Sequence, residues 1–288
     1  MLNFIVNPKS GNGRGARLIK AIEKYCTAKS IEYKMHLTSK TGDGEEYARE
    51  LTQADPEAKI IAVGGDGTFH EVLNGLTDPA VSTLGFIPAG RGNDFARAAN
   101  LSRKVDVAME AIVGGKTKFI DYINCENRRC LNVAGTGLDI DVLERVDGHK
   151  GKIKYLVSLI YCLKHFTPYK VKVEANGTEE EFDCIMVGIC NGVAIGGGIT
   201  LSPVSKIDDG MLDIIVMTMP EDGKIMRVLP KFVKGKHMDL PFTHHVKCEK
   251  AKVTSYNGKP VQLDGEIYRD ITLNCEIAAG GLKIFTAE

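Results

Sequence analysis

The stretch from Ile60 to Thr68, Ile-Ile-Ala-Val-Gly-Gly-Asp-Gly-Thr, restricts the fold of this chain more than any other. Four apolar residues predict a short buried strand, and the glycines after it let the backbone turn sharply and approach a bound group closely. Asp66 adds a carboxylate for a metal or a ribose, Thr68 can cap the next helix, and exposed backbone N–H groups there can receive phosphate oxygens. Taken alone, the stretch is explained equally well as an ordinary strand-to-helix turn.

Two further glycine-rich turns follow predicted strands. The strand Leu2–Val6 leads into Asn7–Gly15, and a strand over residues 83–87 ends in Pro88–Arg97. The first of these turns lacks the Gly-Lys-Ser/Thr ending of a Walker A loop. Four residues between its strand and its first glycine make the match to the dinucleotide fingerprint weak. Three polar glycine turns at successive strand ends favour a phosphate site over three unrelated turns.

Strands and helices alternate along the first part of the chain. This alternation predicts a doubly wound, Rossmann-like parallel sheet, in which ligands bind beyond the carboxyl ends of the strands. From residue 116 onward the predicted strands are accompanied by hairpin signals, Asn176-Gly177 and Asn257-Gly258. The second part is therefore predicted to be antiparallel, as a β-sandwich or an open barrel.

A chain of 288 residues is long enough for two domains. We place an α/β nucleotide-binding domain at residues 1–122 and a β-sandwich domain for lipid substrate and metal at 123–281. The last strand could return to either sheet, so that residues 282–288 could join the first domain. A helix predicted over residues 153–166 is explained better by packing than by membrane contact.

The charge balance of 37 basic and 37 acidic residues argues against a nucleic-acid binder and against a strong hold on an anionic bilayer. Any membrane contact must then be local or mediated by the substrate. Eight scattered cysteines without a Cys-x-x-Cys pair indicate reduced thiols. With no basic segment leading into a long apolar run at the start, we expect a cytoplasmic protein that associates transiently with membranes.

Two acidic clusters stand in the second half of the chain. Asp208 and Asp209 could bind a divalent ion together with loop carbonyls, although spacing alone favours a solvated turn. Asp264 and Glu266 flank a glycine at a strand end, where a general base or a metal-bridging pair is often presented. A simple turn explains this second cluster equally well.

Taken in order, five motifs resemble the soluble lipid kinases of the diacylglycerol kinase catalytic-domain family, which includes bacterial diacylglycerol kinases and eukaryotic sphingosine and ceramide kinases. The resemblance spans nearly the whole chain. The central glycine turn alone is shared with NAD kinases and phosphofructokinases, so the specificity lies in the ordered set. The motifs are Asn7-Pro8-x-Ser10-Gly11, Gly64-Gly65-Asp66-Gly67-Thr68, Pro88-x-Gly90-x-Gly92-Asn93-Asp94-Phe95-Ala96-Arg97, Asp208-Asp209-Gly210 and Asp264-Gly265-Glu266.

The resemblance implies roles for residues at matching positions. Asp264 and Glu266 are the implied catalytic pair, with Asp66, Asp94 and Asp121 as an acidic network around a catalytic Mg²⁺. A structural Mg²⁺ is implied on the Asp209 carboxylate and the carbonyls of Lys206 and Met211. The implied ATP-binding residues are Asn7, Pro8, Lys9, Ser10, Gly11, Thr38, Gly65, Asp66, Gly67, Thr68, Phe69, His70, Glu71, Arg91 and Asn93.

The implied function is ATP-dependent phosphorylation of a lipid hydroxyl, with diacylglycerol converted to phosphatidic acid, at a cleft between the two domains. The lipid substrate would be met at the membrane surface by peripheral contact, and a homodimer is an option that the sequence leaves open. Arg91 departs from the Thr or Ser of many members, so its guanidinium could contact phosphate, change nucleotide choice or weaken catalysis. The alternatives are a kinase for a soluble alcohol such as NAD and a catalytically weak nucleotide-binding regulator.

Overall fold

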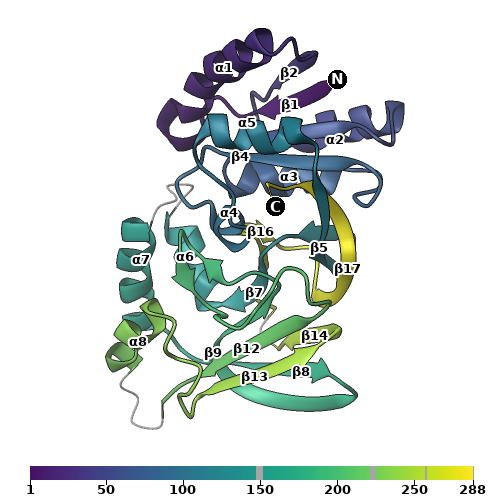
Figure 1. Cartoon of the computed structure of the whole chain (residues 1–288). Helices are drawn as coiled ribbons and strands as arrows, with labels where there is room; N and C mark the ends of the chain where they lie inside the picture. Colours follow the sequence, from purple (N-terminus) through teal and green to yellow (C-terminus); the bar gives the residue numbers. More distant parts are fainter. Residues whose placement is uncertain (147–151, 221–224, 257, 288) are drawn as a thin grey trace. The chain divides into compact units, whose positions relative to one another are not determined.

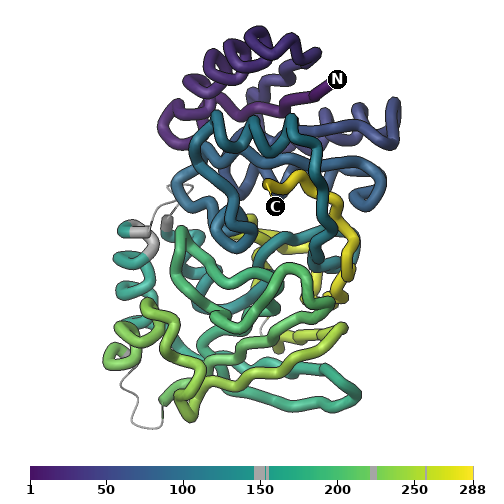
Figure 2. The backbone as a smooth tube through the Cα atoms, viewed as in Figure 1, coloured from purple at the N-terminus to yellow at the C-terminus, as the bar shows by residue number. Residues whose placement is uncertain are grey.

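The computed structural model describes residues 1–146, 152–220, 225–256 and 258–287. The chain divides into two compact units, which Figures 1 and 2 show in the colours of the sequence. Unit 1 comprises Met1–Asp121 and Gly280–Glu288, and unit 2 comprises Tyr122–Ala279. Strands β5 (Thr117–Cys125) and β17 (Leu273–Phe285) each contribute residues to both units.

Unit 1 is built on a parallel sheet with the strand order β2-β1-β3-β4-β17. Strands β1, β3 and β4 are apolar almost throughout, as expected for strands covered on both faces. The strands are β1 (Leu2–Val6), β2 (Tyr33–Leu37), β3 (Lys59–Gly64), β4 (Thr83–Pro88) and the end of β17. The predicted doubly wound parallel sheet is confirmed.

Helices cover the two faces of this sheet in pairs. Helix α1 (Ser10–Ala28) contacts α5 (Val105–Gly114), and α2 (Asp43–Ala54) contacts α3 (Asp66–Gly75). The first pair shares an apolar core with alternate residues of β1 and β3, as the two-residue period of a strand requires. Since β2 and β3 flank β1 on opposite sides, the chain reverses its winding between β1 and β3. Ligands of doubly wound sheets bind at this switch point.

Unit 2 is an antiparallel β-sandwich carrying helices on one outer face. All of its strand pairings are antiparallel in the described part of the chain. Its strands, besides the ends of β5 and β17, are β6 (Arg128–Cys130), β7 (Val133–Gly137), β8 (Tyr169–Ala175), β9 (Thr178–Cys190), β10 (Ala194–Ile195), β11 (Ile199–Thr200), β12 (Leu212–Thr218), β13 (Thr243–Cys248), β14 (Lys250–Ser255), β15 (Val261–Leu263) and β16 (Glu266–Tyr268).

Strand β9 separates two apolar cores of unit 2. Val187 and Ile189 point into the core between the sheet layers, whereas Met186 and Cys190 point into a second core beneath the helices. The helices are α6 (Leu138–Val146), α7 (Lys152–His165), η1 (Ile225–Arg227) and α8 (Leu229–Val233), while α4 (Asp94–Ala98) belongs to unit 1. None of the helices in the described part is long and apolar enough to cross a bilayer.

The two predicted hairpins have different outcomes. Asn176-Gly177 forms the two-residue turn between β8 and β9, with both residues at positive φ. The hairpin expected around Asn257-Gly258 is wrong, because β14 pairs with β8 and β17 whereas β15 pairs with β7 and β16. Residue 257 itself lies outside the described residues.

Candidate functional site

The turns after β3 and β4 are bonded directly to one another in unit 1. The N–H groups of Ala89 and Gly90 donate to the carbonyl of Gly64 at 2.7 and 3.1 Å. A Cβ on Gly90 would lie 2.5 Å from the Cα of Gly65, so the two backbones can approach this closely only as glycines. The predicted site residues of both turns are therefore brought together.

The β1–α1 loop joins the same cluster. Gly11, Asn12 and Gly13 adopt left-handed conformations in succession before the regular part of α1. A Cβ on Gly11 would lie 2.0 Å from the carbonyl oxygen of Ala89, which places this loop against the β4–α4 turn. Asn7 Nδ2 donates to Thr68 Oγ1 at 3.4 Å. Three glycine loops thus meet beside the switch point of the sheet.

Asp66 holds this cluster together as a helix cap. Its two carboxylate oxygens accept the backbone N–H groups of Asn93 and Asp94, each at 2.7 Å, at the start of α4. Asn93 itself is left-handed, with a φ of 54°, so the Asp66 bonds stabilise an otherwise unfavourable turn. The sequence suggested a metal or ribose ligand, and it missed this positioning role, for which a spacing of 27 residues gives no signal.

The other two carboxylates of the expected acidic network accept hydrogen bonds from protein groups, one near in the chain and one far along it. Asp94 Oδ1 accepts Arg97 Nη1 at 3.0 Å, and Asp121 Oδ1 accepts the N–H of Gly280 at 2.7 Å. No group of three or more acidic, histidine or cysteine side chains is placed to hold a metal among the residues that the structure describes. A catalytic Mg²⁺ on these carboxylates stays a prediction.

Arginines surround the glycine loops. Arg14 donates to the carbonyl of Arg103 at 2.6 Å, and Arg103 donates to the carbonyl of Gly90 at 3.5 Å. Arg91 is hydrogen-bonded to Asn12 Oδ1, which joins the β4–α4 turn to the β1–α1 loop. Burial and the nearby charges of Arg103 and Arg17 lower the pKa of Arg14. Guanidinium groups this close repel one another, so an anion among them would be stabilised.

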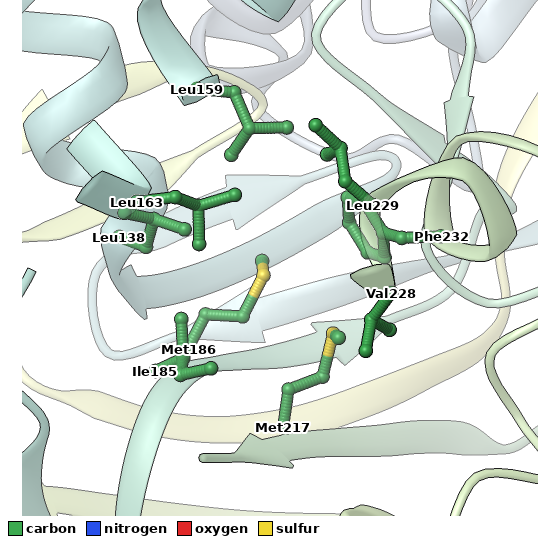
Figure 3. Close-up of a pocket in the computed structure, with 9 residues that line it drawn as sticks. All are labelled: Leu138, Leu159, Leu163, Ile185, Met186, Met217, Val228, Leu229 and Phe232. Carbon is green, nitrogen blue, oxygen red and sulfur yellow. The ribbon is translucent and has the colours of Figure 1, made fainter. Parts of the chain in front are cut away.

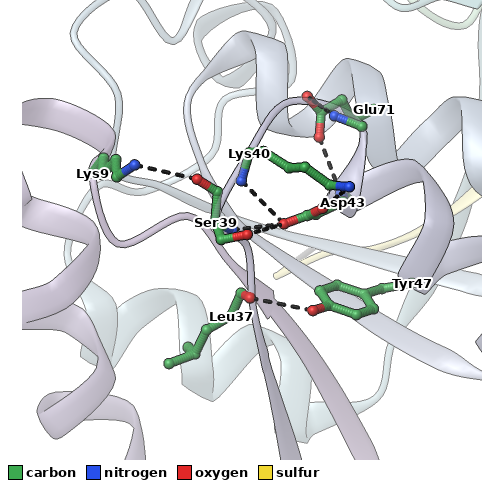
Figure 4. Close-up of polar contacts among 9 residues, drawn as sticks. Lys9, Leu37, Ser39, Lys40, Asp43, Tyr47 and Glu71 are labelled. Carbon is green, nitrogen blue, oxygen red and sulfur yellow. Dashed lines mark hydrogen bonds and ion pairs between the residues drawn. The ribbon is translucent and has the colours of Figure 1, made fainter.

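A fourth loop, between β2 and α2, borders the β1–α1 loop (Figure 4). Asp43 Oδ2 accepts the N–H and the hydroxyl of Ser39 at 2.7 and 2.8 Å and the N–H of Lys40 at 3.1 Å. These bonds, that of the Ser39 N–H first, lower the pKa of Asp43. Lys9 Nζ donates to the carbonyl of Ser39 at 3.2 Å. The sequence analysis did not identify Asp43, because its backbone partners are loop N–H groups, which no residue pattern indicates.

Several residues expected at ATP also have structural roles, and their contact with ATP stays a prediction. Glu71 accepts the N–H groups of Gly42 and Gly44, each at 3.1 Å, and so holds the start of α2 (Figure 4). Phe69 packs its ring 4.7 Å from that of Phe86 in the core, and His70 is buried. The remaining expected positions, Pro8, Ser10, Thr38 and Gly67, lie on or next to the loops described above.

The expected catalytic pair of unit 2 lies on a hairpin. Asp264 and Gly265 form the two-residue turn between β15 and β16, with φ of 53° and 85°. Asp264 Oδ2 accepts the N–H of Leu131 and Oδ1 that of Asn132, both at 2.8 Å. The sequence left a turn and a carboxylate pair as alternatives. The structure shows a turn whose Asp264 carboxylate is fixed by two backbone donors, with Glu266 half-buried beside it.

The loop expected to hold a structural Mg²⁺ carries an ion pair. Asp209 Oδ2 accepts Lys247 Nζ at 2.7 Å, and Asp209 Oδ1 accepts the N–H of Met211 at 3.2 Å. The bond to Asp209 raises the pKa of Lys247, which keeps its ammonium charged. A cation thus already neutralises the one carboxylate of this set, so Asp209, Lys206 and Met211 do not fit a divalent ion in this structure.

Unit 2 also contains an apolar pocket between its sheet and its helices (Figure 3). Its walls come from α6, α7, β9, β12 and the segment of α8. The residues drawn in Figure 3 are Leu138, Leu159, Leu163, Ile185, Met186, Met217, Val228, Leu229 and Phe232. Such a lining suits hydrocarbon and offers nothing to a charged ligand.

Comparisons with known proteins cover most of the chain. Residues 1–125 match the family described as "Diacylglycerol kinase catalytic domain". Residues 132–286 match the family described as "YegS C-terminal NAD kinase beta sandwich-like domain". The diacylglycerol kinase of Bacillus subtilis (strain 168) is 31% identical over 272 residues, 91% of this chain and 88% of that protein. A protein of Salmonella newport (strain SL254), described as a probable lipid kinase YegS, is 29% identical over 77% of each chain.

Solved structures agree with these relatives. A structure from Bacillus anthracis str. Sterne, provisionally described as a diacylglycerol kinase, has a TM-score of 0.81 at 27% identity over 99% of this chain and 97% of that one. An NAD kinase from Archaeoglobus fulgidus in complex with ATP has a TM-score of 0.55 at 14% identity, covering 100% and 94% of the two chains, which shows a shared fold alone. The chain belongs to the diacylglycerol kinase family.

Proposed function

We propose that this protein transfers the γ-phosphoryl group of ATP to the hydroxyl of a lipid alcohol, with diacylglycerol as the acceptor. The observation that carries the proposal is the meeting of three glycine loops at the switch point of the unit 1 sheet, with arginines around them. Backbone N–H groups and guanidinium groups in this arrangement suit the phosphates of a nucleotide.

Phosphoryl transfer depends mainly on alignment and on charge stabilisation. In the proposal the glycine loops of unit 1 bind the ATP phosphates, and Asp264 of unit 2 accepts the proton of the acceptor hydroxyl. Mg²⁺, bound with ATP, supplies positive charge to the phosphate oxygens. The two backbone donors on Asp264 fix the carboxylate in place, as a general base requires.

The apolar pocket of unit 2 supports a lipid rather than a soluble acceptor. All of its lining residues are apolar, and two of its walls are the helical segments α7 and α8 (Figure 3). The outward side of α7 exposes Ile153, Val157 and Tyr161, which recur every four residues and so share one helix face. We propose that this face contacts the membrane surface while an acyl chain enters the pocket.

Incubation with radiolabelled ATP and separate dispersions of candidate acceptors tests the proposal. The acceptors are diacylglycerol, phosphatidylglycerol, a sphingoid base, an undecaprenol-like alcohol and NAD. We expect the label to appear in diacylglycerol, as phosphatidic acid. Label in another lipid alone would show that this lipid, and not diacylglycerol, is the acceptor. Label in NAD alone would contradict the proposal of a lipid kinase. ATP binding without transfer of label would favour a nucleotide-binding regulator.

A further inference from the structure

Asp139 is a buried carboxylate that the proposed reaction does not use. It is the second residue of α6, and only 3% of it is exposed. Its Oδ1 has no hydrogen-bond partner among the described residues. Burial raises the pKa of Asp139 to about 7, although hydrogen bonds from the Ile140 N–H and the Gln262 side chain act to lower it. A carboxylate in such a place needs an explanation besides packing.

Because Gly135 has no side chain, it leaves the space in which the Asp139 and Gln262 side chains contact each other. Strand β15 pairs with β7 so that Gln262 lies opposite Gly135. A Cβ on Gly135 would lie 2.9 Å from Asp139 Oδ2 and 3.1 Å from Gln262 Nε2. A side chain at this position would therefore separate the Asp139 carboxylate from the Gln262 amide.

Gln262 connects Asp139 to the turn that carries Asp264. Gln262 Oε1 accepts the N–H of Gly265 at 2.7 Å, so its Nε2, which only donates, is the atom left for the Asp139 carboxylate. Gln262 is itself buried, and its amide has little freedom to turn.

We infer that Asp139 is a positioning residue which, through the Gln262 amide, holds the Asp264–Gly265 turn in place. The inference rests on the proposed function only in the role given to Asp264. An ionised carboxylate accepts a stronger hydrogen bond than a neutral one. The turn is therefore held more firmly when Asp139 is ionised.

The titratable groups named below as neighbours of Asp139 have pKa values raised away from neutral pH or are held in an ion pair, so Asp139 is the one among them that titrates near pH 7. Burial raises the pKa of Cys184 on β9 to about 12 and that of Tyr169 on β8 well above its ordinary value. Burial likewise raises the pKa of Cys190 on β9 and of Cys162 on α7. Asp141, two residues further along α6, forms an ion pair with Lys259 at 2.9 Å.

The amide signal of Gly265 tests the contact without reference to catalysis. Asp-Gly occurs six times in the sequence, so a protein labelled with ¹³C-carbonyl aspartate and ¹⁵N-glycine reduces the spectrum to those pairs. In the full-length protein we expect the Gly265 signal to titrate with a midpoint near 7. This titration should be absent in Asp139→Asn and in Gln262→Met, and present in the control Asp141→Asn. A Gly265 signal that does not move between pH 6 and 8 in the unmodified protein overturns the inference.

The pH profile of lipid phosphorylation tests the consequence. In Asp139→Asn we expect turnover near pH 8 to fall roughly tenfold and to lose its rise through neutral pH, because a slightly misplaced turn aligns the base poorly. The KM for ATP should be unchanged. Unchanged turnover at every pH, with the protein active, overturns the positioning role. If the Gly265 signal titrates but the protein phosphorylates no lipid, the contact between Asp139 and the turn is supported and the proposed function is overturned.

Discussion

At the scale of single residues, the candidate nucleotide site depends on positions where a side chain would collide with backbone. Gly90 and Gly11 are the clearest, since a Cβ at either would enter the neighbouring loop. The same loops are joined by bonds from single side chains, among them the carboxylate of Asp66. The shape of the site is therefore determined by a few identified atoms, and each can be tested separately.

Gly90→Ala should weaken ATP binding at least tenfold, because a Cβ 2.5 Å from the Cα of Gly65 forces the two turns apart. Calorimetric titration with an ATP analogue measures the effect. Gly114→Ala is the matched control, since a Cβ on Gly114 meets nothing within 4 Å. Equal affinities in the Gly90 variant and in the unmodified protein would exclude this turn from the nucleotide site.

Asp43→Asn should lower the melting temperature at neutral pH, because the Ser39 and Lys40 N–H groups stabilise the charged carboxylate. The pKa of Asp43 is lower in the folded than in the unfolded protein. Its contribution is therefore present above its ordinary value of 3.8 and is lost as the pH falls through the folded value. Melting curves of the two proteins should converge at acidic pH. A difference that stays constant down to pH 3 would rule out the charge as its origin.

At the scale of elements, long-range strand pairing decides what the sequence could not predict. Asn176-Gly177 predicted a hairpin correctly because its strands are neighbours in the chain. The contact of Asp139 with Gln262 depends on β15 pairing with β7, more than 120 positions earlier by the register of Gln262 and Gly135. No local pattern reports such a register, and the same is true of the bonds from Leu131 and Asn132 to Asp264.

The outer face of helix α7 is the surface that we propose contacts the membrane. Val157→Asp should reduce co-sedimentation with lipid vesicles about tenfold, because Val157, 62% exposed, would be buried in the bilayer interface. Val107→Asp on α5 is the control, with Val107 at 40% exposure in unit 1. Equal losses in both variants, or none in either, would show that the face of α7 is not the contact.

The ion pair between Asp209, in the loop before β12, and Lys247 determines the response to chelators that we expect. Because Lys247 already neutralises Asp209, we expect EDTA to leave the melting temperature unchanged. In Lys247→Met the carboxylate loses its ammonium, and added Mg²⁺ should then raise the melting temperature. Lys250→Met removes a comparable exposed pair, with Glu276, and should show no response to Mg²⁺. A lower melting temperature of the unmodified protein in EDTA would indicate a resident ion.

At the scale of the whole molecule, the sequence predicted the architecture and located most loops of the candidate site. Glycine turns after buried strands are local signals, and β1 was predicted to the residue. The roles of individual side chains were less accessible. Glu71, expected at ATP, binds the start of α2, and Asp66 caps α4, because these bonds join loops that only the fold brings together.

In the proposed reaction, nucleotide binding belongs to unit 1 and proton acceptance to Asp264 of unit 2. The most direct measurement compares ATP affinity and lipid turnover in Asp264→Asn, with Asp270→Asn, an exposed residue beyond β16, as control. We expect turnover to fall about 100- to 10,000-fold while the Kd for ATP stays within a factor of about two. Turnover that survives in Asp264→Asn, with its melting temperature unchanged, would contradict the claim.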